Sequence, residues 1–188
     1  MNSKIPNILT LTRLAVVPLF SLFLFDDSLE YRIIFLALFI YASITDFFDG
    51  YLARKYNINT TFGRVFDPIA DKSLILVVFI VLLVKNISYA PYIVIPIMVI
   101  LVRELVISGI REGLAVKKIV IHVSKLGKYK TTIQMICLGF LILGGQENIF
   151  LICIEYTGIV LTYVSMIISF ISGLDYIIKV YKDIVSDE

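Results

Sequence analysis

The sequence predicts an all-helical, polytopic membrane protein with six transmembrane helices. Of its 188 residues, 59% are hydrophobic, and the mean hydropathy is +0.94. Soluble domains are nearer to about 45–50% apolar. Only 17% of the residues are charged. The length suits about six spans of roughly 20 residues with their connections, so we expect residues 1–188 to form one integral membrane domain.

The first three spans are expected at about residues 8–25, 31–53 and 67–84. Pro18 lies inside the first span, where neighbouring helices can satisfy the carbonyl that a proline frees. Asp26, Asp27 and Glu30 mark the far end of this span. The second span stays apolar until residue 44, and then becomes charged. Its last turns must therefore face protein or water rather than lipid.

The last three spans are expected at about residues 91–111, 131–143 and 150–180. Pro91 and Pro96 open the fourth span, and a basic connection separates it from the fifth. Gly144 and Gly145 end the fifth span. The sixth span is long enough to tilt or to extend beyond the bilayer.

The basic residues predict the orientation of the chain. Of the 17 Lys and Arg residues, only Arg32 and Lys85 fall on the side opposite the termini. Cytoplasmic loops carry the excess of Lys and Arg, so we expect both termini in the cytoplasm. The basic residues assigned to the cytoplasmic side are Lys4, Arg13, Arg54, Lys55, Arg64, Lys72, Arg103, Arg111, Lys117, Lys118, Lys125, Lys128, Lys130, Lys179 and Lys182.

Four carboxylates on this same side predict a metal site. Asp46 and Asp49 are three residues apart, and Asp67 and Asp71 are four apart. On helices, each spacing puts the pair on one face. Four like charges in a partly dry site repel one another unless cations neutralise them. Oxygen-only ligation favours Mg²⁺, Mn²⁺ or Ca²⁺, and paired metals are a common device for transfer at phosphorus.

Small residues and one arginine around the carboxylates point to a diphosphate ligand. Gly50 and Gly63 allow close approach of a ligand, and Ala53 keeps the next turn of its face narrow. Arg54 offers a planar donor fork suited to phosphate. The alternative, solvated helix ends with incidental carboxylates, would suit one or two Asp residues rather than four at these spacings.

The pattern Asp46-x2-Asp49-Gly50-x2-Ala53-Arg54-x8-Gly63-x3-Asp67-x3-Asp71 resembles the signature of the CDP-alcohol phosphotransferases at every position. The resemblance implies a six-helix membrane fold, commonly a homodimer, with a two-metal site for Mg²⁺ or Mn²⁺ that opens to the cytoplasm. It also implies transfer of a phosphate-linked group from a CDP-linked donor to an alcohol, with release of CMP.

The same resemblance assigns roles to single residues. It implies that Asp46, Asp49, Asp67 and Asp71 hold the metals. Asp71 would also act as general base on the acceptor hydroxyl, which requires a pKa suited to the working pH. The CDP portion of the donor would contact Gly50, Arg54 and Thr60, with Ala53 and Gly63 lining the same ligand.

The stretch from Ile5 to Arg13 looks like the first helix of the family's bacterial phosphatidylglycerophosphate synthases. By that resemblance, Asn7, Thr10 and Arg13 lie near the nucleotide of CDP-diacylglycerol. The alternative is a simple helix start in which Arg13 extends its charged head to the membrane surface.

Two further stretches resemble the same synthases: Arg103 to Arg111 and Gly127 to Gln134. A phosphorylated acceptor needs cations, and Arg103, Arg111, Lys128 and Lys130 lie on the metal side, so we expect them to bind glycerol 3-phosphate. Glu104 could hold Arg103 in place. The alternative for these four is membrane topology with contacts to anionic lipid.

The resemblance therefore predicts a phospholipid-synthesising transferase of the bacterial inner membrane, surrounded by membrane lipids and without a nucleic-acid partner. It would move a phosphatidyl group from CDP-diacylglycerol to glycerol 3-phosphate. With phosphatidylglycerol as acceptor, the protein would instead be a cardiolipin synthase. A divalent-cation transporter is a remote alternative, because the outer halves of the spans are nearly all apolar and Arg54 would repel a cation in transit.

Overall fold

The computed structural model describes residues 4–55, 61–85, 90–116 and 125–186. These residues form six α-helices and one 3-10 helix, without a strand among them, which confirms the all-helical prediction. The chain divides into two compact units, Met1–Ala90 and Pro91–Glu188.

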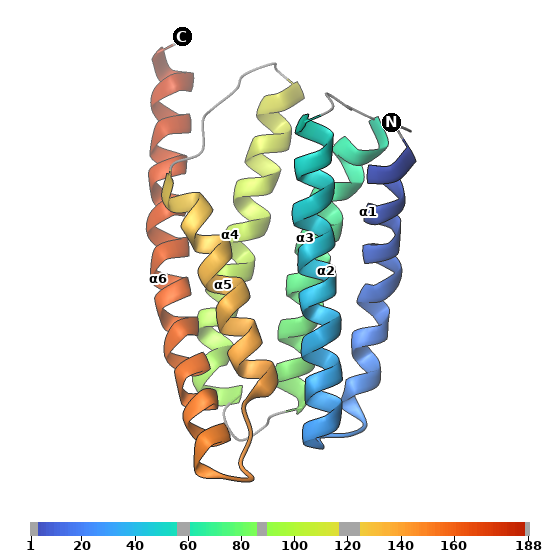
Figure 1. Ribbon diagram of the computed structural model, residues 1–188. Coiled ribbons are helices and arrows are strands. Elements are labelled where there is room, and N and C mark those ends of the chain that lie inside the picture. Colours follow the sequence, from blue (N-terminus) through green and yellow to red (C-terminus); the bar gives the residue numbers. More distant parts are fainter. Residues whose placement is uncertain (1–3, 56–60, 86–89, 117–124, 187–188) are drawn as a thin grey trace. The chain divides into compact units, whose positions relative to one another are not determined.

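The first unit contains α1 (Lys4–Val16), the 3-10 helix η1 (Val17–Leu24), α2 (Leu29–Lys55) and α3 (Thr61–Lys85) (Figure 1). Helix α1 packs against both α2 and α3, and η1 packs mainly against α3. Residues 10 and 13 of α1 contact residues 67 and 71 of α3. Helices α1 and α3 therefore run in the same direction, with α2 returning between them along the chain.

The segment around Pro18 departs from the expected continuous α-helix. At Val17 the α-helix changes to a 3-10 helix, and Pro18 stands in its first positions. Proline has no N–H to give to an α-helical bond, and its ring crowds the preceding turn. Phe20 and Phe23 of η1 pack against Phe35 of α2, with ring centroids 5.1 and 4.6 Å apart. The change of helix type thus coincides with the aromatic core of this unit.

The second unit contains α4 (Ala90–Val116), α5 (Lys125–Leu143) and α6 (Ile149–Ser186). Helices α5 and α6 form a tightly packed antiparallel hairpin. As expected, α5 ends just before Gly144, whose N–H donates to the carbonyl of Phe140 at 2.9 Å. A Cβ on Gly144 would lie 2.7 Å from the Cα of Glu155 in α6. Only glycine allows the hairpin to close so tightly at this point.

Helix α4 packs along α6 in the same direction. Tyr163 Oη donates to the carbonyl of Tyr92 at 2.6 Å, and Arg103 Nη2 donates to Ser172 Oγ at 3.0 Å further along both helices. An apolar cluster continues this contact: Ile107 and Leu114 of α4 with Tyr176 and Val180 of α6. Arg103 therefore lies on the face of α4 that packs against α6.

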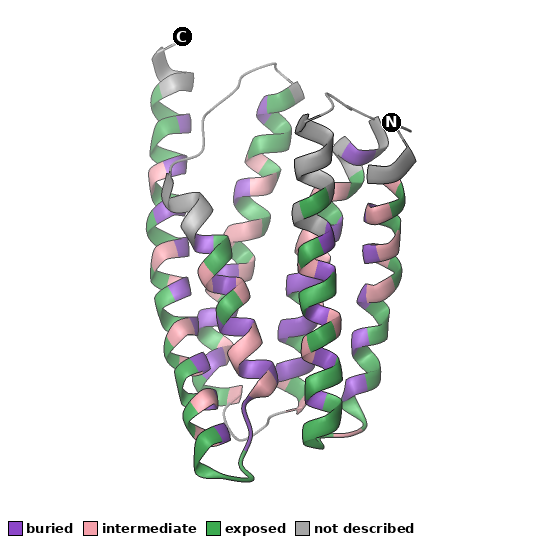
Figure 2. Ribbon diagram, viewed as in Figure 1, coloured by how far each residue is buried: buried purple, intermediate pink, exposed green. Residues whose placement is uncertain are grey.

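Three helical segments among the described residues are long and apolar enough to cross a membrane: Asn7–Leu24, Ala90–Ala115 and Ile149–Lys182. Residues Lys130–Leu143 form a shorter apolar helix. Buried positions recur every three or four residues along α6, while large apolar side chains such as Val160, Ile167 and Phe170 are exposed (Figure 2). A broad apolar surface of this kind is suited to lipid.

Several helices continue beyond the spans expected from hydropathy. Helix α3 begins at Thr61 rather than near residue 67, and α5 begins at Lys125 rather than near residue 131. A helix satisfies its own backbone groups in water as well as in lipid, so it need not end where the hydrocarbon ends. Asp67 and Asp71 of the signature, and Lys125, Lys128 and Lys130 of the basic connection, are consequently carried on helical turns.

Candidate functional site

Asp67 and Asp71 lie one turn apart on α3, as their spacing predicts. Both are partly exposed, and the side chain of Asp71 is 41% accessible. Pro68, directly after Asp67, lies inside the helix. The two carboxylates therefore share a face in the first turns of α3, where a ligand can reach them.

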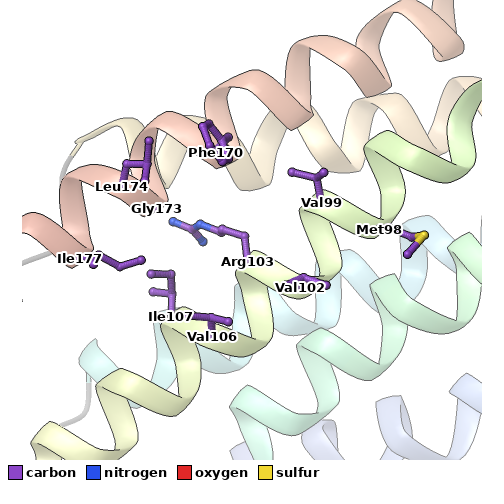
Figure 3. Close-up of a pocket in the computed structure, with 10 residues that line it drawn as sticks. All are labelled: Met98, Val99, Val102, Arg103, Val106, Ile107, Phe170, Gly173, Leu174 and Ile177. Carbon is purple, nitrogen blue, oxygen red and sulfur yellow. The ribbon is translucent and has the colours of Figure 1, made fainter.

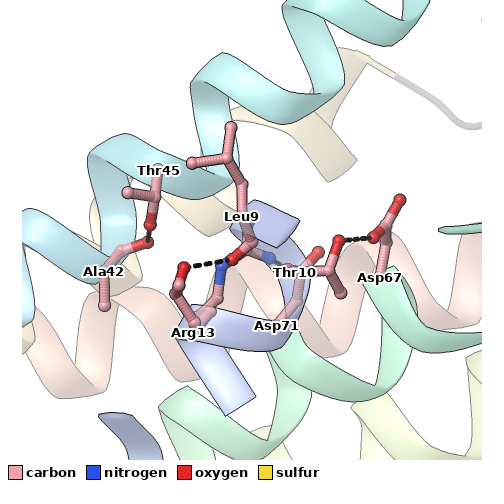
Figure 4. A network of polar contacts seen from close by, with 8 residues as sticks. Leu9, Thr10, Arg13, Ala42, Thr45, Asp67 and Asp71 are labelled. Carbon is pink, nitrogen blue, oxygen red and sulfur yellow. Dashed lines mark hydrogen bonds and ion pairs between the residues drawn. The ribbon is translucent and has the colours of Figure 1, made fainter. Parts of the chain in front are cut away.

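Helix α1 provides a hydrogen-bond donor for each of these carboxylates. Thr10 Oγ1 donates to Asp67 Oδ1 at 2.6 Å, and Arg13 Nη1 donates to Asp71 Oδ1 at 2.6 Å (Figure 4). The Arg13 side chain is fully buried. Hydrogen bonds between charged groups are short and strong, and a buried guanidinium needs such a partner. The two contacts anchor the carboxylate-bearing turns of α3 to α1.

This arrangement gives Thr10 and Arg13 contacts that sequence reasoning did not anticipate. Both were expected near the nucleotide, and the structure pairs them with the predicted metal ligands. Thr10 and Arg13 are three residues apart, so they share a face of α1 and match a pair spaced four apart on a parallel helix. The spacing was visible in the sequence, but nothing there placed α1 beside α3.

The other predicted ligands and nucleotide contacts lie on α2, near the start of α3 or, for Asn7, on α1. Thr45, just before the α2 pair of aspartates, is buried and donates to the carbonyl of Ala42 at 2.8 Å. Gly63 is buried in the first turn of α3, and Asn7 of α1 is half-buried. Thr60 lies outside the described residues. The side chains at five positions of α2 also lie outside what the structure describes: Asp46, Asp49, Gly50, Ala53 and Arg54.

The carboxylates of α3 suit a divalent cation in their chemistry. Carboxylate oxygens are the hard ligands that Mg²⁺ and Mn²⁺ prefer, and Asp71 is accessible enough to receive an ion. Among the side chains that the structure describes, no three acidic, His or Cys groups lie close enough to hold a metal. The α3 pair fits as one half of a metal site, and the α2 pair stays a prediction.

In the second unit, Glu104 brings two of the predicted acceptor-binding cations together. Lys130 Nζ of α5 donates to Glu104 Oε1, and Arg103 Nη1 lies 3.6 Å from Glu104 Oε2. All three side chains are mostly buried, with exposed fractions of 5% for Lys130, 12% for Arg103 and 19% for Glu104. Two cations share one carboxylate, which leaves this group of three with a net positive charge.

The remaining two acceptor candidates, Arg111 and Lys128, lie on α4 and α5. Arg111 is exposed, and its guanidinium carbon lies 6.0 Å from the centre of the Tyr176 ring, within range of a cation–π contact. Lys128 lies on α5, with its side chain outside what the structure describes. The structure thus joins Arg103 and Lys130 and places Arg111 two turns further along α4.

A groove of about 410 Å³ opens between α4 and α6 beside Arg103 (Figure 3). Among the described residues that line it, Arg103 alone is charged, and its side chain extends from α4 towards Gly173 of α6. Sequence reasoning found little specific signal in the last span, so it missed this neighbour. The other lining residues are Met98, Val99, Val102, Val106, Ile107, Phe170, Leu174 and Ile177.

The two basic residues expected on the far side of the membrane also meet. Lys85 Nζ and Arg32 Nε lie 3.1 and 3.7 Å from the same oxygen of Asp27. Lys85 ends α3, and Asp67 lies near its beginning. At 1.5 Å per residue, the two positions are roughly 27 Å apart along the helix. That separation agrees with the expected placement of Asp67 and Lys85 at opposite faces of a bilayer.

Comparison with known proteins finds similarity over nearly the whole chain. A family model described as CDP-alcohol phosphatidyltransferase matches residues 3–172. A CDP-diacylglycerol–glycerol-3-phosphate 3-phosphatidyltransferase from Rickettsia felis is 42% identical over 177 residues, covering 94% of each chain. Proteins of the same name from Rickettsia typhi and Wigglesworthia glossinidia brevipalpis are 43% and 39% identical. The matched regions cover 92% and 98% of this chain, and 94% and 98% of the two relatives' own chains.

Proposed function

Because this chain belongs to the CDP-alcohol phosphatidyltransferase family, we propose that it transfers a phosphatidyl group from CDP-diacylglycerol to glycerol 3-phosphate. The products are phosphatidylglycerophosphate and CMP. The observation that carries this proposal is the similarity, along more than nine-tenths of the chain, to relatives named for this reaction. The chain is a membrane protein by its family and by its apolar helices.

Asp46, Asp49, Asp67 and Asp71 would hold Mg²⁺ or Mn²⁺, which when bound would supply positive charge to the diphosphate of the donor. Thr10 and Arg13 support this role by holding one oxygen of Asp67 and of Asp71 in place. A carboxylate with one oxygen fixed by a hydrogen bond keeps its orientation when a ligand binds. Gly50, Ala53, Arg54, Thr60 and Gly63 would line the CDP portion of the donor, with Asn7 of α1 nearby.

The proposed chemical step is a substitution at phosphorus. The 1-hydroxyl oxygen of glycerol 3-phosphate attacks the phosphorus that carries diacylglycerol and forms the new P–O bond. The P–O bond to the CMP phosphate breaks, and CMP leaves with the bonding electrons. Asp71 takes the hydroxyl proton as general base. The accessibility of Asp71 supports this assignment, and the contact with Arg13 would hold the carboxylate in one orientation.

The acceptor's phosphate would bind to the cation-rich group of the second unit. Arg103 and Lys130 share Glu104, so their three charges sum to one positive charge that an anion can satisfy. Mostly buried cations attract a phosphate more strongly than solvated ones, because water screens them less. Arg111 and Lys128 would add charge near the membrane surface.

We also propose the placement of the enzyme in the cell. The excess of Lys and Arg on the side of the aspartates supports an active site and termini that face the cytoplasm of a bacterial inner membrane. The contacts of Arg32 and Lys85 with Asp27 support placing these three residues together at the end of the first unit opposite the aspartates. A homodimer remains part of the proposal through the family resemblance.

The test is a reconstituted transfer assay. Purified full-length protein is given labelled CDP-diacylglycerol, Mg²⁺ and one acceptor at a time, and CMP and the lipid product are measured. Glycerol 3-phosphate should give phosphatidylglycerophosphate, and no product should form without a divalent cation. If product formed with phosphatidylglycerol as acceptor and none formed with glycerol 3-phosphate, the protein would be a cardiolipin synthase and the proposal would be wrong. For variants of the four metal-site aspartates, Asp27→Asn is the matched control, because it changes a carboxylate at the opposite end of the first unit.

A further inference from the structure

The side chain of Arg103 contacts one turn of α6. Its Nη2 donates to Ser172 Oγ at 3.0 Å, and Ser172 Oγ donates in turn to the carbonyl of Ser169 at 3.1 Å. Because the Ser172 hydroxyl has given its hydrogen to α6, its oxygen faces Arg103 as an acceptor. Ser172 and Ser169 are buried. The position of the guanidinium is therefore set by a backbone-anchored hydroxyl.

Gly173 makes room for this contact. A Cβ at position 173 would lie 2.9 Å from Cγ and 3.1 Å from Nε of Arg103. These atoms are in the middle of the side chain, so a methyl group would displace its whole outer half rather than a flexible tip. Gly173 is itself buried, and Figure 3 shows Arg103 directed towards it across the groove. Any side chain here would move the guanidinium away from Ser172.

The apolar surroundings of Arg103 make its charge energetically unfavourable. The groove around it is otherwise lined by apolar residues and Gly173, and Arg103 Nε is buried with no hydrogen-bond partner among the described residues. A charge inside a membrane helix is costly and is usually retained for function. A purely structural contact between α4 and α6 does not need an arginine, because a well-packed apolar residue in such a place is often as stable or more stable. The held guanidinium is better explained by a ligand that it serves.

We infer that Ser172 and Gly173 are positioning residues for the acceptor substrate, acting through Arg103. They hold its guanidinium on one side while Glu104 approaches it on the other, so that Arg103 and Lys130 present a fixed pair of cations to the phosphate of glycerol 3-phosphate. This inference rests on the proposed function. It assigns to α6 a part in acceptor binding that its sequence did not indicate.

The central experiment is Gly173→Ala in the full-length enzyme with steady-state kinetics. The KM for glycerol 3-phosphate should rise roughly tenfold, the scale of one weakened contact to a charged group. The KM for CDP-diacylglycerol and kcat should change less than twofold. Ser172→Ala should raise the same KM, and Ser172→Thr, which keeps the hydroxyl, should restore it. An unchanged KM in both Gly173→Ala and Ser172→Ala would overturn the inference.

Two other glycines provide matched controls. A Cβ at Gly158, also on α6, would lie 2.9 Å from Cδ2 and 3.0 Å from the backbone N of Leu141 in α5, so Gly158→Ala introduces at least as much crowding away from Arg103. Apart from the backbone of its own helix, no described residue has an atom within 4 Å of a Cβ at Gly109 on α4. Gly158→Ala should lower thermal stability without raising the KM for glycerol 3-phosphate, and Gly109→Ala should change neither. A rise in KM for Gly158→Ala equal to that of Gly173→Ala would show that crowding alone is responsible.

A double-mutant cycle separates this inference from the proposed function. If Gly173 acts only through Arg103, Gly173→Ala should add nothing to the KM of Arg103→Ala. Additive effects would contradict the positioning role. If Arg103→Ala leaves the KM for glycerol 3-phosphate unchanged, the acceptor site of the proposed function is wrong. If Arg103→Ala raises it and neither α6 variant does, only the role of Ser172 and Gly173 is wrong.

Discussion

Two groups of charged side chains in this protein each contain both signs of charge, and their net charges are opposite. In the first unit, Arg13 neutralises one of two neighbouring carboxylates, Asp67 and Asp71, and Thr10 supports the other. In the second unit, Glu104 is shared by two cations, Arg103 and Lys130. The first group keeps an excess negative charge, and the second keeps an excess positive charge.

The difference shows how a largely apolar chain can keep unbalanced charges. Among the side chains that the structure describes, each group contains one oppositely charged member, which makes burial tolerable but leaves one charge of the group uncompensated. An uncompensated carboxylate suits a divalent cation, and an uncompensated cation suits a phosphate. The internal partners thus orient the charged side chains, and the excess charge remains for ligands.

The largest expected effect comes from removing the base in the carboxylate-rich group. Asp71→Asn keeps the size of the side chain but removes its ability to accept a proton. Phosphatidyl transfer should fall by a factor of about 10² to 10⁴, measured as CMP release by protein recovered from the membrane in normal amount. An active Asp71→Asn enzyme would exclude Asp71 as general base.

Removing the buried partner of Asp71 should have the next largest effect on transfer. Arg13→Ala leaves Asp71 without its ion pair and opens space between α1 and α3. We expect activity to drop by roughly 10- to 100-fold and thermal stability to decrease, because truncating one partner of a buried pair is costly. Arg13→Lys keeps the charge without the planar fork, and should recover only part of the activity. Wild-type activity in Arg13→Ala would mean that the α1 contacts do not position Asp71.

Glu104→Gln tests whether Glu104 holds Arg103 and Lys130 together. Two mostly buried cations would then lack a carboxylate, which should lower the free energy of unfolding by about 3 kcal/mol. The melting temperature in detergent reports this change. Ser172 still holds Arg103, so the KM for glycerol 3-phosphate should change less than it does in Arg103→Ala. A normal melting temperature would show that Glu104 does not hold these cations together.

The smallest effect is expected at the far end of the first unit. Asp27 is more than half exposed and contacts Lys85 and Arg32. The side chains of Lys85 and Arg32 are only 5% and 3% exposed, so Asp27→Asn should lower the melting temperature. The decrease should be smaller than in Glu104→Gln, because water reaches Asp27 and screens its charge, and transfer should stay unchanged. A loss of activity comparable to that of Asp71→Asn would mean that the two ends of the unit are not separate in function.

Much of the local structure was predictable from the sequence. The apolar segments indicated the helices, and Gly144 and Gly145 marked the end of α5 correctly. The spacing of Asp67 and Asp71 placed both on one face of α3. These features depend on residues within one or two turns of each other, so helical periodicity is enough to reveal them. Pro18 was placed in the right segment, but its change to a 3-10 helix was not anticipated.

The sequence by itself determined the fold class, the family and the charged residues that carry the proposed chemistry. Tertiary structure alone decided their partners: Thr10 with Asp67, and Arg103 with Ser172 and Gly173. These partners are 57 to 70 positions apart, and any of several polar residues on a helix face could have filled each role. The choice depends on which helices pack together and at what register, which is a property of the packed helices and not of any one segment.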